Sequence, residues 1–404
     1  MTEKTILNPN EEYRIVPLNM LSFRDAPRCD LTGSRALVQL VTHFNSIYYT
    51  NDEMAEQAWF GIIKKIDHLL APLRQPAPIV GTSEERARRS AATIASKRSL
   101  TEFCLTESSN LLSLQKYHLA VPAAIMALKF SKDCDGERSL AVVEPYLQLA
   151  QAYLGLEQLD KAEEFLSMGR WIVLNSEECE DRIKSRMYML MGRVNTSLGK
   201  FEEAKPEFAN AIFFMSKFQG AEAVSTSMGY FRLGDVYMAQ GLLEAALAFF
   251  DKVVDIWYKY LSALHNPESD SDTFLGETVI NMPPELENLS EEQLAEGRSQ
   301  LDQILDTRKQ LLGVGHIATG EIEYTIGLFE FFLLGHEANA EVFMNSALNT
   351  YKSSLGEAHP STRHVTSVLV LVKAQAARRN AAINGAGSAV PGEGDAFASQ
   401  SIPV

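Results

Sequence analysis

The chain has 404 residues, of which 46% are hydrophobic, and it carries a formal net charge of −15 with a sequence pI near 5.1. This acidity gives the chain no electrostatic reason to bind nucleic acid or an anionic membrane surface, and no run of about 18 apolar residues predicts a transmembrane helix. The four cysteines show neither CxxC pairing nor disulfide spacing, and the polar start is not expected to be a secretory signal, so we expect a reduced cytosolic compartment.

Residues 1–80 do not follow the pattern of the rest of the chain. Tyr48-Tyr49 is followed by Gln57 and Trp59, and then by an amphipathic run that ends at Arg74. This order resembles the MYND zinc finger, which needs eight Cys or His ligands because its closed tetrahedral sites take such donors. The resemblance places the last four ligand positions at residues that cannot bind zinc: Thr50, Met54, Ile62 and Ile66.

The first four ligand positions of the MYND pattern are also mostly without donors. They fall near Cys29, Gly33, Val41 and Phe44, and His43 is the only other candidate. One Cys and one His cannot close two zinc sites. We therefore predict a MYND-like segment over 1–80 that has no metal and no cofactor, with an apolar core in place of the zinc. A chance resemblance is the alternative.

Residues 81–265 repeat a pattern with a period of 42 residues. A fixed period indicates a repeat architecture, and each unit is predicted to form two antiparallel helices that approach closely at small residues. The pattern resembles the tetratricopeptide repeat, which Gly229–Trp257 fits best. The repeated positions are a small-residue pair (Leu149-Ala150, Met191-Gly192, Leu233-Gly234), an aromatic ladder (Tyr146, Tyr188, Tyr230) and an alanine followed by a large residue (Ala162 and Leu166, Ala204 and Phe208, Ala246 and Phe250).

The period is longer than the usual 34 residues of that repeat, by about two helical turns per unit. The long form resembles the repeats of kinesin light chain, whose LGxxHP ending is matched by Leu355–Pro360 and more weakly by Leu312–His316. We expect His316 and His359, in these endings, to cap helices by hydrogen bonding and not to act as bases. Glycines nine positions after the second-helix alanine predict left-handed helix caps at Gly136, Gly220 and Gly356.

The predicted fold class is an all-α tetratricopeptide-repeat solenoid of long helix pairs, preceded by the MYND-like segment. Repeats one to four occupy 81–265 and diverged repeats five and six occupy 290–380, with unit cores at 101–138, 143–180, 185–222, 227–264, 290–316 and 321–365. The acidic insert 266–289 is predicted to be a disordered loop, with a partner contact as the alternative, and a capping box at Ser290–Gln293 restarts helix. The Ala/Gly/Ser-rich segment 381–404 is predicted to be a flexible tail.

Short stretches in a characteristic order carry a further resemblance. They cover roughly residues 45–260, with weaker similarity to about 360: Leu69–Arg74, Ser83–Arg86, Glu102–Cys104, Ala120–Ala124, Ala162–Leu166 and Gly229–Phe231. With the MYND-like start, this layout resembles the zinc finger MYND domain-containing protein 12 family of ciliary and flagellar axonemal proteins. The missing zinc ligands depart from that family and leave a zinc-dependent role without support.

The resemblance implies a structural role in the motile axoneme, beside inner dynein arms on doublet microtubules. The implied partners are an inner-arm dynein heavy chain and a protein like tetratricopeptide repeat protein 29. The implied location is the axoneme of the cilium or flagellum, with a cytoplasmic pool. No nucleic acid and no membrane are expected as partners.

The sequence carries little that indicates catalysis. Patterns of the GxxxxGK[ST], GxGxxG, GxSxG and HExxH kind are missing, and the chain has no room for the strand-rich domain of a SET methyltransferase. Trp171, Trp257 and the aromatic ladder are expected to pack in the core. We therefore expect a non-catalytic protein, and a methyltransferase-like enzyme is an alternative that a bound cofactor or measured turnover would revive.

The expected function is protein binding along the repeats, because solenoids offer extended surfaces. An axonemal adaptor would hold a partner helix or a dynein tail on the concave face, built from the first helix of each unit, or on the edge of the stack. The alternative is a cytosolic peptide or cargo adaptor resembling kinesin light chain, in which Lys, Arg and Asn of that helix clamp a peptide. The candidate partner-binding positions, expected to be exposed, are Gln148, Gln151, Arg193, Asn195, Arg232 and Asp235.

Overall fold

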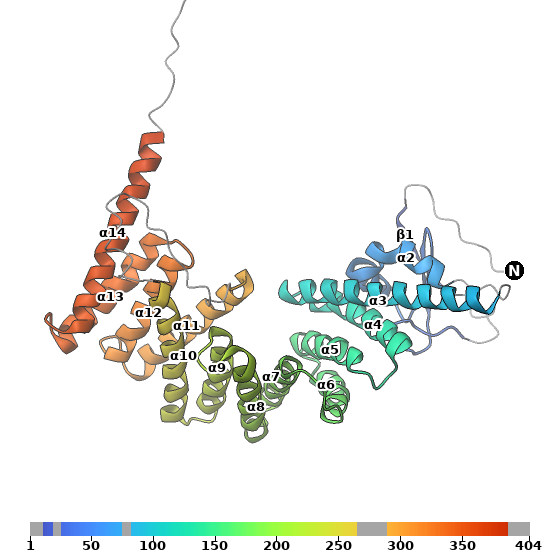
Figure 1. Cartoon of the computed structure of the whole chain (residues 1–404), viewed down its shortest axis with the longest axis horizontal. Helices are drawn as coiled ribbons and strands as arrows, with labels where there is room; N and C mark the ends of the chain where they lie inside the picture. The colour runs from blue at the N-terminus through green and yellow to red at the C-terminus, as the bar shows by residue number, and fades with distance from the viewer. Residues whose placement is uncertain (1–10, 19–25, 75–81, 265–288, 387–404) are drawn as a thin grey trace, which may run out of the picture. The chain divides into compact units, whose positions relative to one another are not determined.

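The structure is a computed structural model that describes residues 11–18, 26–74, 82–264 and 289–386 (Figure 1). The chain divides into two compact units. Unit 1 comprises Met1–Ala221 and Asp235–Leu242, and unit 2 comprises Glu222–Gly234 and Leu243–Val404, so helix α9 (Val224–Ala239) contributes to both. Within the described ranges, no helix combines the length and apolar character that a membrane span requires.

Unit 1 begins with a small antiparallel sheet of three strands in the order β1-β2-β3. Leu40 and Ile47 face each other in the register of β2 and β3, and both are fully buried. The strands are β1 (Tyr13–Pro17), β2 (Val38–Thr42) and β3 (Ser46–Tyr49), and the helical elements that follow are α1 (Asp52–Ala58), the π-helical turn η2 (Trp59–Ile63) and α2 (Lys64–Arg74). This sheet and these helices share one hydrophobic core with the first helix pair of the repeats.

The rest of unit 1 consists of antiparallel helix pairs, as the 42-residue period predicts (Figure 1). A capping box of Thr82 and Glu85 starts the first helix, so the stretch Ser83–Arg86 forms its first turn. The pairs are α3 (Ser83–Ser113) with α4 (Tyr117–Asp135), α5 (Val143–Gly155) with α6 (Leu159–Leu174), and α7 (Asp181–Ser197) with α8 (Phe201–Gln219); the 3-10 turn η3 (Leu140–Val142) precedes α5.

Unit 2 holds the later helices, and two predictions of its boundaries are wrong. The described part of 290–316 contains one helix and not a pair, although the predicted capping box at Ser290 is confirmed. The last helix runs to Ala386, past the predicted start of the tail, because alanines there favour helix. The helices are α10 (Leu243–Leu264), α11 (Glu291–Leu311), α12 (Ile317–Phe332), α13 (Glu337–Leu355) and α14 (Pro360–Ala386). The insert, up to residue 288, and residues 387–404 lie outside the described residues.

The turn inside each of the first four pairs has the same geometry. The amide after a residue of positive φ donates to a carbonyl five residues earlier, as in a Schellman motif. The residues of positive φ are 42 positions apart: Gln115 (φ 56°), Glu157 (φ 58°), Gly199 (φ 73°) and Gly241 (φ 75°). The predicted glycines at the ends of second helices also have positive φ, but their ψ values near 150–165° differ from the left-handed helical value that we expected: Gly136, Gly220 and Gly356.

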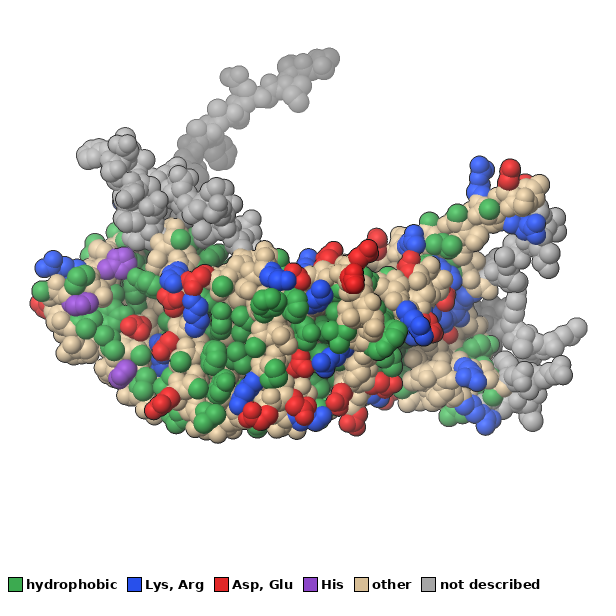
Figure 2. Space-filling view, turned by 60° about the horizontal axis from the view of Figure 1, so that its bottom comes forward, with side chains coloured by type: hydrophobic (Ala, Val, Ile, Leu, Met, Phe, Trp, Pro, Cys, Tyr) green, Lys and Arg blue, Asp and Glu red, His purple; other side chains and the backbone are tan. Residues whose placement is uncertain are grey.

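The core confirms part of the predicted packing. The alanines Ala162, Ala204 and Ala246 are fully buried, and Trp257 is 1% exposed. The prediction for Trp171 is wrong, because its side chain is 51% exposed and lies beneath the guanidinium of Arg138. In the aromatic ladder Tyr146 is buried, whereas Tyr188 and Tyr230 are half-buried. Exposed hydrophobic side chains lie among charged side chains of both signs on the face that Figure 2 turns forward.

Candidate functional site

The six predicted partner-binding positions are less accessible than expected. Gln148 is only 3% exposed, so the expectation that its side chain is accessible is wrong. Its Nε2 donates to the Leu105 carbonyl at 3.3 Å and to Glu144 Oε1 at 3.2 Å. The bond to Leu105 ties α5 to α3, and the bond to Glu144 lies within α5, so the buried Nε2 of this polar side chain is satisfied. The other five are half-buried: Gln151, Arg193, Asn195, Arg232 and Asp235.

Two of these positions, Gln148 and Gln151, make polar contacts with neighbouring first helices of unit 1. Arg186 of α7 forms an ion pair with Glu144 of α5, 42 residues earlier, and its Nη2 lies 3.5 Å from Gln151 Oε1. Asn195 does not join this set and instead lines a cavity on the other side of α7. The structure therefore brings Gln151 and Gln148 to one polar ladder, and Asn195 to a different place.

The cavity at Asn195, here called the α6–α8 cavity, has a volume of about 350 Å³. Three carboxylates and one guanidinium line it. Arg170 Nη1 lies 3.6 Å from Glu207 Oε1, whereas the buried Glu207 Oε2 has no partner among the described residues. Burial raises the pKa of the Glu207 carboxyl, and the charge of Glu203 adds to this while Arg170 opposes it. The lining side chains come from α6, α7 and α8: Glu163, Leu166, Ser167, Arg170, Met191, Val194, Asn195, Glu203, Pro206 and Glu207.

A larger cavity, here called the α10–α14 cavity, lies within unit 2 and has a volume of about 510 Å³. Five helices contribute to its walls, so residues from Asp251 to Val365 converge on it. The lining combines carboxylates, three tyrosines, one arginine and small polar groups: Asp251, Val254, Asp255, Tyr258, Arg308, Glu321, Tyr324, Thr325, Tyr351, Pro360, Ser361, His364 and Val365. Its size is typical of ligand pockets.

Arg308 lines this cavity and is 1% exposed. Its Nη1 donates to the Ala318 carbonyl at 2.5 Å, and its Nη2 is paired with the Asp251 carboxylate. The Nε atom has no partner among the described residues. Both terminal nitrogens of the guanidinium are thus bound to groups of the same chain. The lining also contains the carboxylates of Asp255 and Glu321.

The tyrosines form an aromatic wall. The ring centroids of Tyr258 and Tyr324 are 6.2 Å apart, and those of Tyr324 and His364 are 6.0 Å apart at nearly a right angle. Burial raises the pKa of the Tyr324 hydroxyl above its ordinary value, and its oxygen has no hydrogen-bond partner among the described residues. Burial also raises the pKa of Tyr351, with the Glu321 charge as the next cause.

Sequence reasoning missed the α10–α14 cavity. One signal was available, because Asp255 occupies the position 42 residues after Phe213 and 84 after Trp171, both of which are exposed aromatics. The fourth repeat thus has a carboxylate where the second and third repeats have an exposed aromatic side chain, which indicates that this surface of the fourth repeat has a different role. The lining residues outside α10 lie on α11 to α14, which the 42-residue pattern does not align.

The MYND-like positions lie in or beside an apolar core. Ile62 and Ile66 are fully buried with Cys29 in the core of the sheet, and Met54 packs against it. The Thr50 hydroxyl lies 3.5 Å from the Met54 sulfur. Among the described residues, no group of three or more His, Cys, Asp or Glu side chains is arranged to hold a metal ion.

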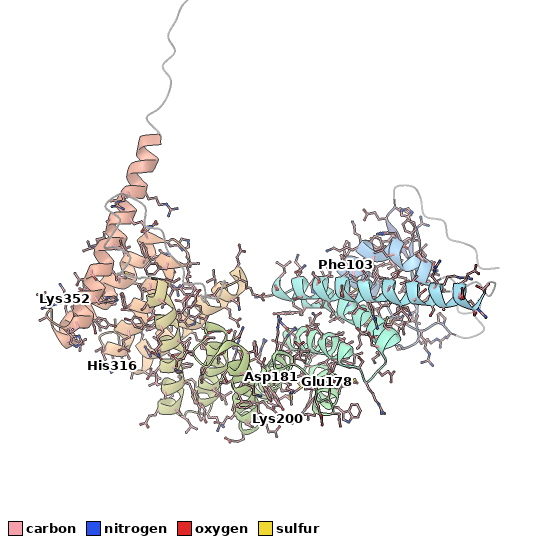
Figure 3. The ribbon with its side chains drawn as sticks, viewed as in Figure 1. Phe103, Glu178, Asp181, Lys200, His316 and Lys352 are labelled. Atoms are coloured by element: carbon pink, nitrogen blue, oxygen red, sulfur yellow. The ribbon has the colours of Figure 1, made fainter. Side chains whose placement is uncertain are left out.

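The two histidines of the repeat endings are helix caps, as predicted. His316 Nδ1 accepts from the Ala318 amide at 3.2 Å, and His359 Nδ1 accepts from the Ser361 amide at the same distance. Figure 3 labels His316 at the turn before α12. A threonine three residues later donates to the preceding turn glycine in both cases, Thr319 to Gly313 and Thr362 to Gly356, each at 2.9 Å.

Comparison with known proteins supports the repeat assignment. A model of the tetratricopeptide repeat matches residues 143–167, 185–212 and 229–256, which fall in the second, third and fourth predicted units. The chain therefore contains tetratricopeptide repeats, and repeats of this type bind proteins.

Solved structures that the chain matches include three proteins of low sequence identity. They are a Rap protein complexed with competence and sporulation factor (15% identity, 81% of this chain and 76% of that chain, TM-score 0.40), putative kinesin light chain repeats from Podospora anserina (13%, 64% and 95%, TM-score 0.33) and aspartyl phosphate phosphatase F from Bacillus subtilis (12%, 80% and 84%, TM-score 0.37). The fold class follows from the helix pairs and the three matched repeats.

Proposed function

We propose that this chain is a non-catalytic adaptor that binds proteins through its repeats, as a structural subunit of the motile ciliary or flagellar axoneme. The observation that carries the adaptor role is the set of three tetratricopeptide repeats at residues 143–167, 185–212 and 229–256. Helix-pair arrays of this kind present long surfaces in which each repeat contacts only its neighbours. Carboxylate-lined cavities in both units add recesses in which partner side chains can be held.

The axonemal part of the proposal is supported by the ordered short stretches that resemble the zinc finger MYND domain-containing protein 12 family. In this proposal the chain joins an inner-arm dynein heavy chain and a protein like tetratricopeptide repeat protein 29 to doublet microtubules. The N-terminal sheet then serves as a packing module, because its apolar core joins the first helix pair.

Fluorescent tagging of the endogenous protein in a flagellated cell, followed by detergent and then high-salt extraction, tests this proposal. We expect signal along the detergent-resistant axoneme that is lost with an inner-arm dynein at high salt. A matched control is a tagged variant that lacks the three matched repeats, which we expect to be diffuse. A diffuse, detergent-soluble signal for the intact protein would contradict the axonemal role.

A second candidate is a cytosolic peptide or cargo adaptor resembling kinesin light chain. The observation that favours it is the histidine-capped ending of the repeat, seen at both His316 and His359. Full solubility after detergent, together with co-purification of a motor or its cargo, would support this second function in place of the first.

A further inference from the structure

We infer that the α10–α14 cavity of unit 2 binds a lysine or arginine side chain presented by a protein partner. This inference rests on the proposal that the chain binds proteins, and it names the chemistry of one contact. Three kinds of observation carry it: the balance of charge in the cavity, the aromatic wall, and the buried hydroxyl of a lining tyrosine that has no partner among the described residues.

The charge balance favours a cation. Asp251, Asp255 and Glu321 line the cavity, and Arg308 is the only arginine or lysine among the described residues of its lining. The terminal nitrogens of Arg308 are held by Asp251 and the Ala318 carbonyl, so only its buried Nε lacks a partner among the described residues. Lys259 lies outside the lining and pairs with Asp255 at 2.9 Å, whereas the third carboxylate forms no ion pair within 4 Å with a described residue and feels the Arg308 charge only from further away.

That third carboxylate, Glu321, accepts no side-chain or backbone hydrogen bond from any described residue, although it lies on α12 at the cavity. Desolvation raises the pKa of its carboxyl, with the Asp251 charge adding to the effect and Arg308 opposing it. Glu321 is exposed at the cavity, so an incoming cation can reach its carboxylate and is attracted by its charge.

The aromatic wall fits the same ligand. Tyr258, Tyr324 and Tyr351 line the cavity, and cationic side chains bind over tyrosine rings. The long methylene stem of Lys or Arg also suits the apolar side chains Val254 and Val365, which are buried in the lining.

The hydroxyl of Tyr324 is the independent sign of a ligand. Tyr324 is 3% exposed, lines the cavity and has no hydrogen-bond partner for its oxygen among the described residues. A buried polar group in a native structure is almost always satisfied. An ammonium or guanidinium group in the cavity would donate to this oxygen.

The test uses the full-length chain and saturation-transfer NMR with four small probes. These are Nα-acetyl-lysine N-methylamide, the matching arginine amide, the neutral norleucine amide and the anionic glutamate amide. We expect the lysine or arginine probe to bind with a Kd on the order of 1 mM, and the norleucine and glutamate probes to bind at least about tenfold more weakly.

Two variants connect binding to the cavity. Glu321→Gln removes the carboxylate without a partner, and we expect about tenfold weaker binding, the loss of one charge-assisted contact. Asp306→Asn is the matched control, because Asp306 is an exposed carboxylate of the same unit outside the cavity, and its affinity should equal that of the wild type. Tyr324→Phe should weaken binding several-fold.

Equal binding of the norleucine and lysine probes would overturn the inference, as would preferential binding of the glutamate probe or insensitivity to Glu321→Gln. Failure of this test leaves the tagging result unaffected, so the two proposals fail separately. If the tagged protein stays on the axoneme while no cationic probe binds, only the cavity assignment is wrong.

Discussion

The ring of Phe208 lies 2.6 Å from the position that a Cβ atom would occupy at Gly192. The same relationship recurs 42 residues later, where the Phe250 ring lies 2.4 Å from a Cβ atom placed at Gly234. Real Cβ atoms do not approach other atoms this closely, so the glycine on the first helix is what allows phenylalanine on the second.

The repeat before these shows the complementary solution. At the equivalent positions it has Ala150 and Leu166, both buried. A larger residue on the first helix thus accompanies a smaller one on the second, as expected if the helix spacing is held constant by close packing. At these two positions of the repeat, a change of side-chain volume on one helix is therefore matched by an opposite change on the facing helix.

Gly192→Ala should destabilise the protein by about 1–3 kcal/mol, because overpacking of a filled core forces side chains out of their rotamers. Adding Phe208→Leu should recover a large part of that loss, since the pair then copies Ala150 and Leu166. Urea unfolding followed by circular dichroism measures both, and a double-mutant cycle should give a coupling of roughly 1 kcal/mol or more.

Gly169→Ala is the control for this cycle. A Cβ atom there would lie 3.7 Å from the Tyr146 Cβ, an ordinary contact. The substitution should stabilise the helix interior by up to about 1 kcal/mol. Equal effects at Gly169 and Gly192 would contradict the packing argument.

Glu157→Gly should stabilise unit 1 by about 0.5–1 kcal/mol. Glu157 has φ 58° at a turn position where the third and fourth repeats use glycine. A residue with a Cβ is strained in this conformation by roughly 1–2 kcal/mol, from which the higher entropy of glycine in the unfolded chain subtracts part. Thermal unfolding measures the change, and the reverse substitution Gly199→Ala should lower the melting temperature. A loss of stability for Glu157→Gly would show that contacts of the Glu157 side chain contribute more to the stability of unit 1 than its backbone strain costs.

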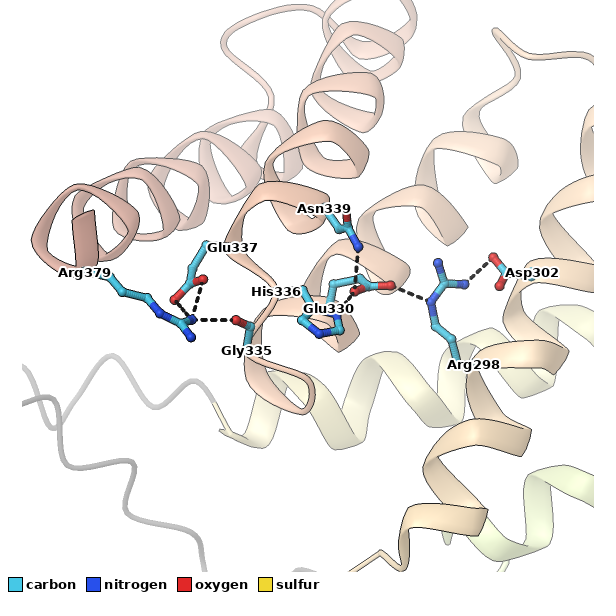
Figure 4. A network of polar contacts seen from close by, with 8 residues as sticks. All are labelled: Arg298, Asp302, Glu330, Gly335, His336, Glu337, Asn339 and Arg379. Carbon is cyan, nitrogen blue, oxygen red and sulfur yellow. Dashed lines mark hydrogen bonds and ion pairs between the residues drawn. The ribbon is translucent and has the colours of Figure 1, made fainter. Parts of the chain in front are cut away.

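Glu330 should make unit 2 sensitive to acid. It is 4% exposed and is held by Arg298 Nε at 2.8 Å and by His336 Nδ1 at 3.0 Å (Figure 4). Burial alone would raise the pKa of this carboxyl, but the hydrogen bonds from Arg298 and His336 outweigh it, so the pKa is lowered. At acidic pH the Glu330 carboxyl therefore binds fewer protons in the folded state than in the unfolded state. Its contribution to stability is fully present above the unfolded-state pKa, near 4.3, and is lost as the pH falls through the lower pKa of the folded state.

Glu330→Gln should remove this part of the pH dependence. The measurement is the free energy of unfolding at pH values from about 7 down to about 3 for both proteins. The variant should be less stable than the wild type at neutral pH, and the difference should shrink on acidification. Glu357→Gln, at a carboxylate with an 80% exposed side chain, is the control and should change little. A constant difference across the pH range would rule out the assignment to Glu330.

Tyr324→Phe should stabilise the unliganded protein while it weakens binding of a cationic probe. A buried hydroxyl without a partner carries a desolvation penalty of about 1–3 kcal/mol, which phenylalanine avoids. Opposite signs for stability and binding distinguish a ligand-facing hydroxyl from a structural one. Tyr258→Phe, at a ring that is 37% exposed, should stay within about 0.5 kcal/mol of the wild type. A less stable Tyr324→Phe protein would mean that the hydroxyl has a structural partner.

Much of the fold could be predicted because it depends on local rules. The helix pairs, the turn at Gly199 and the histidine caps follow from hydrogen bonds and sterics within a few residues, and the 42-residue period then repeats them. The all-α fold class of the repeats and the buried alanines were predictable for the same reason.

The sequence by itself determined the repeat unit, its small and large positions and its turns. Only the tertiary structure decided which side chains are covered, because burial depends on neighbours from distant segments. Gln148 is buried by its contact with α3, and Trp257 is covered by α11, where a Cβ atom at Gly297 would lie 2.3 Å from its ring, whereas Trp171 stays exposed. The α10–α14 cavity likewise needs five helices to meet, and no periodic pattern in one segment specifies such a meeting.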